Sequence, residues 1–414
     1  MKRVVIIGAG PAGMMAAAVA AQEGAAVTLV EKMDRPGRKL AITGKGRCNI
    51  TAAVERDQLI KGYPGNGRFL YSAFNELSNY DLIDLFNSEG LETKVERGNR
   101  VFPVSDDAFQ VVDVLYKRVR RLGVKILTGT TVKGLNIAQG AVTGLVTVQC
   151  GLPAEAVIIC TGGMSYPGTG STGDGYAWAA EAGHTIIDPR PGLVPLTVSE
   201  SWVGDLQGLS LKNVKASAFT EDGKKINEDF GEMLFTHFGL SGPIILSMSH
   251  DIGRELHKNG KPVKVKIDLK PALSEEKLDS RLLSDLEKYS RKIFKNALGD
   301  LLPQKMIAVI IGLSGIDPEK ECHQITRAER LGLGKLLKNF TLTVNGTRPI
   351  AEAIVTAGGV ATREINPKTM ESRLVKGLFF AGEVLDVDGY TGGYNLQAAF
   401  STGYVAGKYA ARED

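Results

Sequence analysis

The chain has 414 residues, and at about 150 residues per domain this length predicts two or three domains. With 43% hydrophobic and 23% charged residues the composition is typical of a globular protein and excludes a disordered chain, while a net charge of +4 is too weak to indicate nucleic-acid binding. The four cysteines form no C-x-x-C pair, which excludes a dithiol centre of that spacing and a cysteine-rich zinc site, so no metal is expected.

The start of the chain predicts a β-α-β unit. The segment RVVII at 3–7, apolar after Arg3, is too short for a signal peptide and predicts a buried strand. An alanine-rich helix at 11–23 and a strand at 26–30 follow it. No apolar stretch approaches the roughly 18 residues of a membrane span, so no membrane partner is expected. Cysteines in a chain without a secretory signal favour a cytoplasmic protein.

Further elements alternate up to about residue 190. We expect helices at 67–88 and 106–122, strands at 92–102, 124–127 and 156–160, and a hairpin at 131–149. The pattern then changes, with strand-like segments within 193–268, an amphipathic helix at 274–301 and a helical pattern through 303–337. After a strand at 339–344 the opening style returns, with LFF at 378–380 and a helix from 393.

This order predicts an α/β fold in which an insert interrupts a Rossmann-like nucleotide-binding domain. We expect the domain to comprise residues 1–190 and 345–414. The insert is expected to have a β-rich part at 191–270 and a mainly helical part at 271–344.

The turn after the first strand matches the dinucleotide fingerprint G-x-G-x-x-G, as Gly8-Ala9-Gly10-Pro11-Ala12-Gly13. The glycines permit a tight turn and a close approach of a pyrophosphate, and the helix N-terminus offers free N–H groups. Glu31, at the tip of the second strand and next to Lys32, is expected to bond both ribose hydroxyls and to repel the 2′-phosphate of NADP. The fingerprint alone does not choose between NAD and FAD.

A second glycine run, residues 168–173, also spells G-x-G-x-x-G. A second dinucleotide site for NAD(P)H is one interpretation. However, the preceding strand ends at Cys160 and Pro167 intervenes, so the strand-turn-helix geometry is missing. We favour a glycine-rich loop that leads into a helix from Asp174.

Two returning segments favour FAD, the longer dinucleotide. One strand ends in Thr161-Gly162-Gly163, and another ends in Gly382-Glu383, whose acid suits ribitol hydroxyls. The helix that begins at Gly393 is expected to present its N-terminus to the flavin pyrimidine ring and to stabilise negative charge there. The alternative is an ordinary strand-end turn at each place.

Candidate catalytic residues are few. His237, in THFGLSGP of the insert, is the best histidine candidate for proton transfer, with a structural loop histidine as the alternative. Arg38, Lys39, Lys45 and Arg47 form a cationic loop that is expected to hold phosphates or to line the flavin, with a solvated loop as the alternative. Arg47 itself is expected to bind an anionic substrate or to stabilise reduced flavin, with a role on the cofactor side alone as the equal alternative. Tyr166, Tyr390 and Tyr394 are candidate wall residues or packing residues, and a packing role is expected for Cys48.

The chain resembles the bacterial BaiN-like NAD(P)/FAD-dependent oxidoreductases, which include relatives of aminoacetone oxidase. The resemblance covers nearly the whole chain. It rests on the segments GAGPAGMMAA, GRKLAITGKGRCNIT, CTGGMSYPGTGSTGDGY, FTHFGLSGP, TAGGVATREI and GLFFAGEVLDVDGYTGGYNLQAAFSTG. One departure is Ala52, where the family often has asparagine, which removes one polar contact near the flavin.

The resemblance implies a two-dinucleotide-binding type flavoprotein fold that stably binds FAD only, with a β-barrel-like and a helical piece in the insert. It implies that the FAD phosphates meet Gly10, Ala12 and Gly13, and that Glu31 holds the adenosine ribose and Val132 the adenine. The remaining cofactor contacts that it implies are Arg38, Lys39, Arg47, Cys48, Asn49, Thr161, Gly162, Gly382, Glu383, Tyr394, Asn395 and Leu396. The family's activities, bile-acid enone reduction and aminoacetone oxidation, differ, so the substrate stays open.

We therefore expect an FAD-dependent reductase or dehydrogenase of a small organic molecule, reduced by NAD(P)H that binds transiently. A flavin oxidase that uses oxygen is the alternative within this class. From other classes, a flavoprotein acting on tRNA and a redox sensor without turnover stay open, although the dispersed charges argue against a nucleic-acid partner. The sequence does not indicate an oligomeric state.

Overall fold

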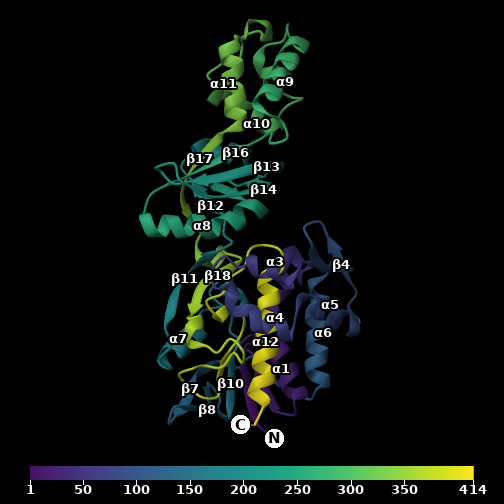
Figure 1. Cartoon of the computed structure of the whole chain (residues 1–414), viewed down its shortest axis with the longest axis vertical. Helices are drawn as coiled ribbons and strands as arrows, with labels where there is room; N and C mark the ends of the chain where they lie inside the picture. The colour runs from purple at the N-terminus through teal and green to yellow at the C-terminus, as the bar shows by residue number, and fades with distance from the viewer. Residues whose placement is uncertain (414) are drawn as a thin grey trace. The chain divides into compact units, whose positions relative to one another are not determined.

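The computed structural model describes residues 1–413, which group into two compact units (Figure 1). Residues Met1–Gly192 together with the chain from Ile350 onward form the first unit, and Leu193–Pro349 form the insert unit. Within residues 1–413, no helix is both long enough and apolar enough to cross a membrane.

A five-stranded sheet in the order β19-β10-β1-β2-β6 forms the centre of the first unit, and all its strands are parallel. Helices cover both faces of such a sheet, so its strands are short and apolar, and β10 is buried at every residue. The strands are β1 (Arg3–Ile7), β2 (Ala26–Val30), β6 (Lys125–Leu127), β10 (Ala156–Ile159) and β19 (Leu378–Phe380). Their carboxyl ends meet at one edge, where ligands bind in parallel sheets.

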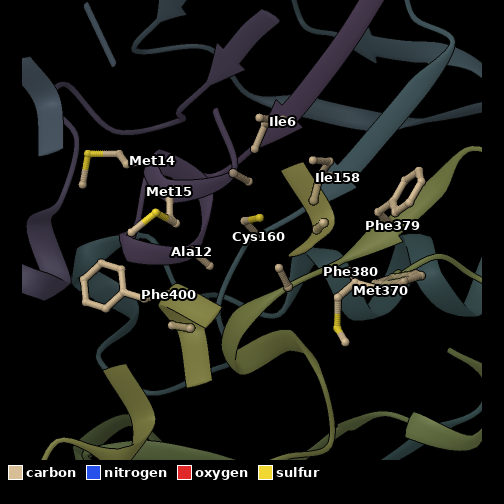
Figure 2. Close-up of a cluster of buried hydrophobic side chains, with 14 of the residues drawn as sticks. Ile6, Ala12, Met14, Met15, Ile158, Cys160, Met370, Phe379, Phe380 and Phe400 are labelled. Atoms are coloured by element: carbon tan, nitrogen blue, oxygen red, sulfur yellow. The ribbon is translucent and has the colours of Figure 1, made fainter. Parts of the chain in front are cut away.

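Two central helices, α1 (Pro11–Gln22) and α12 (Tyr394–Ala411), pack closely against each other. A Cβ atom added at Gly403 would lie 2.4 Å from the carbonyl oxygen of Ala12, so the contact depends on the missing side chain. Figure 2 shows the core around this contact, with Met14 and Met15 of α1 and Phe400 of α12. The first and last parts of the described chain are therefore one packed layer.

The other elements of the first unit surround this core. Its remaining helices are α2 (Arg38–Ile42), α3 (Arg56–Lys61), α4 (Tyr71–Glu76), α5 (Asn79–Ser88), α6 (Ala108–Arg121) and α7 (Asp174–Glu181). Its smaller sheets contain β3 (Thr51–Ala52), β4 (Thr93–Glu96) and β5 (Arg100–Pro103); β7 (Val132–Ala138), β8 (Ala141–Thr147) and β9 (Gly151–Pro153); and β11 (Ile186–Gly192) with β18 (Val355–Val360).

The insert unit contains a closed six-stranded barrel in the order β12-β15-β14-β13-β16-β17. Along β16 the apolar residues of VKVKID are buried and the lysines exposed, because alternate residues face opposite sides of a strand. The strands are β12 (Leu196–Val198), β13 (Ser210–Phe219), β14 (Lys225–Phe235), β15 (Gly239–Ser241), β16 (Val263–Asp268) and β17 (Phe340–Thr347). The helices are α8 (Pro243–Asn259), α9 (Glu275–Lys288), α10 (Gln304–Ser314) and α11 (Arg327–Lys338).

The insert differs from the sequence expectation in two places. The strand-like stretch 193–268 contains the 17-residue helix α8, whose signal was Pro243 at its first position and Ile244, Met248 and Ile252 four residues apart. The helix expected over 274–301 ends at Lys288. Beyond it, Ile293 pairs with Glu321 in an isolated β-bridge, so a long-range contact replaces the local helical bonds.

Candidate functional site

The turn between β1 and α1 has a backbone that only glycine fits. Gly8 has φ +99°, and a Cβ there would lie 2.5 Å from the carbonyl oxygen of Cys160; at Gly13 it would lie 1.8 Å from that of Gly8. At Gly10, by contrast, an added Cβ meets no atom within 4 Å. No side chain caps the N-terminus of α1, which therefore offers N–H groups and a positive dipole end to a phosphate.

Glu31 lies beside this turn. Its Oε2 accepts a hydrogen bond from the N–H of Ala9 and its Oε1 from that of Met33, each at 2.8 Å. A carboxylate oxygen accepts more than one bond, so both retain capacity for ribose hydroxyls. The backbone thus orients the carboxylate at the tip of β2.

The second glycine run lies next to the same strand tip. The Nζ of Lys32 forms an ion pair with Oδ2 of Asp174 at 2.7 Å and a hydrogen bond with Thr172. A Cβ on Gly170 would lie 3.0 Å from Cγ of Met33. The run begins inside a 3-10 turn at Pro167–Thr169, well after β10 ends at Ile159, so its geometry differs from that of the first glycine turn.

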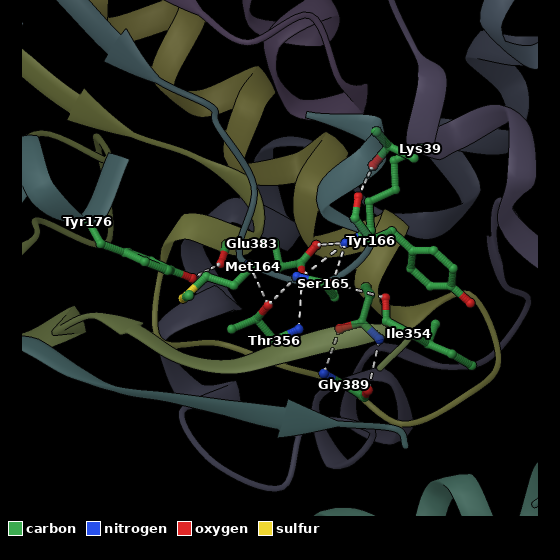
Figure 3. A network of polar contacts seen from close by, with 11 residues as sticks. Lys39, Met164, Ser165, Tyr166, Tyr176, Ile354, Thr356, Glu383 and Gly389 are labelled. Carbon is green, nitrogen blue, oxygen red and sulfur yellow. Dashed lines mark hydrogen bonds and ion pairs between the residues drawn. The ribbon is translucent and has the colours of Figure 1, made fainter. Parts of the chain in front are cut away.

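Glu383 is the centre of a polar network that joins four segments (Figure 3). Its Oε1 accepts from Oγ of Ser165 at 3.0 Å and from the N–H of Thr356 at 2.8 Å, and its Oε2 lies 2.8 Å from Nζ of Lys39. A Cβ on Gly163 would lie 2.3 Å from Oγ1 of Thr356. Protein donors therefore hold the carboxylate of Glu383, the residue that is expected to bind the ribitol hydroxyls.

The network also contains residues that the sequence did not single out. Ser165 and Thr356 are not among the residues expected at the site, although both lie in segments that carry the resemblance, CTGGMSYPGTGSTGDGY and TAGGVATREI. Oγ1 of Thr356 accepts from the N–H groups of Met164 and Ser165 at 2.8 and 3.2 Å. These contacts fix the path of the chain after Gly163.

Glycines bring the end of β19 next to the start of α1. Gly382 has φ +78°, and a Cβ there would lie 2.9 Å from Cβ of Ala12. Gly162, at φ +71°, follows Thr161, whose Oγ1 is buried without a hydrogen-bond partner. The two segments expected beside the cofactor therefore meet the glycine turn directly.

The N-terminus of α12 has no side-chain cap either. Gly393 has φ +96°, and its missing side chain lets it approach Thr51, whose carbonyl oxygen would lie 2.5 Å from an added Cβ. The side-chain amide of Asn395 bonds both the N–H and the carbonyl of Gly389 at 2.8 Å, so this residue anchors a loop. Tyr394 packs edge-on against Tyr63, and Leu396 packs on the core.

The loop from Thr43 to Asn49 combines unusual backbone with buried polar atoms. Lys45 and Cys48 have φ of +60° and +59°. Cys48 is fully buried, and burial raises the pKa of its thiol to about 12, which keeps it protonated and suits packing rather than redox work. The Oδ1 of Asn49 is buried without a partner and is free to accept from a ligand.

The guanidinium of Arg47 interacts with three other side chains of the protein. Its guanidinium lies 4.2 Å from the ring centre of Phe102 and pairs with Asp106 at 2.6 Å and with Glu96 at 2.5 Å. Hydrogen bonds to these carboxylates raise the pKa of Arg47. An anionic substrate would have to compete with two carboxylates for this side chain.

The other expected site residues lie apart from the network. Arg38 pairs with Asp34 at 3.3 Å, and Val132 is buried at the start of β7. His237 lies in the insert unit between β14 and β15, where its exposed ring packs edge-on against Phe238. Within the described residues, no group of three or more His, Cys, Asp or Glu side chains is placed to hold a metal.

These features fit a dinucleotide with a long polar tail. Two uncapped helix N-termini, the glycine turn and the oriented Glu31 suit a pyrophosphate and a ribose. The unpartnered oxygens of Asn49 and Thr161 supply further polar contacts. When bound, FAD would lie along Gly10, Ala12, Gly13, Gly162, Gly382 and the start of α12.

Known proteins match the chain over nearly its full length. The chain is 35% identical to the 3-dehydro-bile acid delta(4,6)-reductase of Clostridium scindens over 99% of each protein. It is 34% identical to the ribosomal RNA dihydrouridine synthase of Escherichia coli, covering 97% of this chain and 96% of that protein. A solved 3-ketosteroid delta1-dehydrogenase from Sterolibacterium denitrificans, with a TM-score of 0.53, 14% identity and coverage of 99% and 100%, shows the fold alone.

A family model described as the HI0933-like protein Rossmann domain matches residues 2–409. The match confirms the resemblance inferred from the motifs, and with the barrel of the insert unit it confirms the expected fold class. The protein is an FAD-dependent oxidoreductase. The chain belongs to the HI0933-like Rossmann family of flavoproteins.

Proposed function

We propose that the protein reduces a carbon–carbon double bond conjugated to a carbonyl group, with NAD(P)H as the reductant. One observation carries this proposal: two relatives whose matches cover 99% and 97% of this chain differ in substrate but share this chemistry. A delta(4,6)-reductase of a 3-dehydro compound saturates double bonds that extend from a ketone. A dihydrouridine synthase saturates the ring double bond of uridine, which is conjugated to a ring carbonyl.

The reaction balances without a further reactant. NAD(P)H gives up a hydride and the solvent a proton; the substrate gains one hydrogen on each carbon of the double bond. Bound FAD supplies the relay for the hydride. The N-terminus of α12 is oriented to stabilise negative charge, and the glycine turn and Glu31 hold the dinucleotide in place.

The first candidate substrate is a small planar enone. The 35% identical relative acts on a bile acid, and the net charge of +4 does not call for a polyanionic partner. The second candidate is a uridine of ribosomal RNA, which the 34% identical relative favours. Both present a flat conjugated ring with a carbonyl.

The alternatives give different readouts. A flavin oxidase would be reduced by its substrate and reoxidised rapidly by oxygen. A sensor without turnover would retain flavin that neither nicotinamide nucleotide reduces. A reductase is reduced by NADH or NADPH and passes the electrons to an enone or uridine faster than to oxygen.

The test is a set of anaerobic half-reactions on the purified protein. After the visible spectrum has been recorded, the protein is mixed with NADH and then NADPH, and bleaching of the flavin band is followed. The reduced protein is next mixed with 4-androstene-3,17-dione or with uridine-containing ribosomal RNA, and products are identified by a mass gain of two hydrogens. Reduction of neither probe, or flavin that neither nucleotide bleaches, would contradict the proposal.

A further inference from the structure

Tyr166 has a positive φ of +51°, a backbone conformation that a tyrosine side chain disfavours. Nine residues other than glycine have positive φ within residues 1–413. Asn99, Asp106 and Asn213 have short polar side chains that tolerate this region, and Gln139 lies in the hairpin turn between β7 and β8. The side chains of Cys48, Leu193 and Met370 are buried in the packed interior. Lys45 and Tyr166 are the two residues of this set to which none of these descriptions applies. Lys45 lies between two glycines in an irregular loop, whereas Tyr166 does not.

Hydrogen bonds hold Tyr166 in this left-handed conformation, at φ +51° and ψ +59°. Its N–H donates to the carbonyl of Ala351 at 3.2 Å, and its carbonyl accepts from the N–H and Oγ1 of Thr169 at 2.8 and 2.7 Å. The preceding residue, Ser165, bonds Nζ of Lys39 and Oε1 of Glu383. Through Ser165, the backbone at Tyr166 is therefore joined to the polar network around Glu383.

The fold does not bury the Tyr166 side chain. Tyr166 is 40% exposed, and Ile354 next to the same network is 38% exposed. Figure 3 shows both side chains extending to the same side of the network, away from Thr356. A strained residue that the surroundings hold in place without burying it is a mark of a functional position.

We propose that the Tyr166 ring is the surface on which the planar conjugated ring of the substrate stacks, with Ile354 beside it. This deepens the proposed function and rests on it. Aromatic faces bind flat conjugated rings in offset stacks, for a steroid enone and a uracil alike. A side chain with a fixed backbone loses little entropy on binding, so the strain is offset by preorganisation.

The test variant is Tyr166→Asn, because asparagine tolerates the left-handed region and removes the ring. Its matched control is Tyr80→Asn, which makes the same change at an exposed tyrosine, 48% accessible, on α5. Three quantities are compared with the wild type: the midpoint of thermal unfolding, the rate at which NADPH bleaches the flavin, and the rate at which each probe reoxidises it. The probes are 4-androstene-3,17-dione and a short uridine-containing RNA.

The expected result is specific to the second half-reaction. Tyr166→Asn should keep or raise the unfolding midpoint and leave bleaching by NADPH unchanged, while reoxidation at low probe concentration falls at least about fivefold. The probe that shows the loss identifies the source of the ring. Tyr80→Asn should leave both rates unchanged. Unchanged reoxidation in Tyr166→Asn, or a lower unfolding midpoint without a loss of reoxidation, overturns the inference.

The outcome is separable from failure of the proposed function. If the wild-type flavin is reoxidised by neither probe, the proposed function fails, and Tyr166 is judged by binding instead. The oxidised flavin band is then titrated with each probe. A spectral shift that Tyr166→Asn abolishes supports the stacking surface; a shift that persists in the variant, or no shift in the wild type, overturns it.

Discussion

The Nζ atom of Lys39 lies 2.8 Å from Oε2 of Glu383, although 344 residues separate them along the chain. Both side chains are about one-fifth exposed, so water only partly screens the pair. The contact joins α2, just after the β-α-β unit, to the end of β19. An ion pair between the first and last thirds of the chain therefore joins two of the segments that are expected to hold the cofactor.

Replacing Lys39 with methionine should destabilise the protein by about 1–3 kcal/mol, because Glu383 would keep a partly buried charge without its cation. Retention of FAD through gel filtration should also fall. Lys117→Met is the control, since Lys117 is 73% exposed in its side chain and pairs with Asp113 on a helix surface. Equal unfolding free energies and equal flavin content for both variants would contradict the assigned role.

Two glycines of the first turn should respond oppositely to alanine. At Gly13 an added Cβ would lie 1.8 Å from a backbone oxygen, so Gly13→Ala should lower the unfolding midpoint of the apoprotein. Gly10 has room and φ −80°, so Gly10→Ala should fold normally and yet bind FAD weakly, because its methyl group would occupy the approach of the pyrophosphate. Thermal unfolding and flavin absorbance measure the two effects. Full flavin content in Gly10→Ala would place the phosphates elsewhere.

Glu31→Ala should weaken FAD binding by about tenfold or more, because a charged hydrogen-bond partner of the ribose is lost. The variant also removes the acceptor for the N–H groups of Ala9 and Met33, so the turn loosens. Glu23→Ala, at the far end of α1, provides the comparison. Equilibrium titration of apoprotein with FAD gives the affinity, and an unchanged value would show that the fingerprint is misassigned.

The free energy of unfolding should decrease as the pH falls, because the protonation of His184 differs between the folded and the unfolded chain. Its side chain is fully buried, with Nε2 2.9 Å from Oγ of Ser372 and Nδ1 3.3 Å from Glu364. Burial lowers its pKa below 6.5 in the folded protein. The unfolded chain therefore binds the proton more readily, and the free energy of unfolding should decrease as pH falls from above 6.5 toward the folded pKa.

Urea unfolding at a series of pH values measures this decrease, and His184→Gln should lose most of it between pH 7 and the folded pKa. His237→Gln, at an exposed histidine, should keep the wild-type profile. Identical pH profiles for wild type and His184→Gln would rule out His184 as the titrating group.

Cysteine labelling should distinguish packing from reactivity. Cys150 is exposed, whereas Cys48, Cys160 and Cys322 are buried, and burial raises the pKa of all three thiols. A maleimide should label one cysteine in the folded protein and four after denaturation. Labelling of folded Cys150→Ser would show that a buried thiol opens to solvent.

Local sequence patterns determine the first β-α-β unit and the strands of the parallel sheet. The glycine turn, Glu31 and the helix after it are specified within about thirty residues, because turn geometry and helix starts depend on neighbouring residues. The returning segments indicated FAD, and the family match bears this out. The strands of the parallel sheet were visible because burial on both faces demands apolar runs.

Only the tertiary structure decided how the distant segments combine. Asn395, expected along the flavin, also bonds Gly389 through its side-chain amide. Arg47 forms ion pairs with Glu96 and Asp106, which lie 49 and 59 residues away along the chain. Ser165 and Thr356 lie in segments that carry the family resemblance, but nothing in those segments shows that both residues bond the side chain of Glu383. Side chains of this kind gain meaning from their neighbours in space, because hydrogen bonds and ion pairs depend on distance and burial rather than on order in the chain.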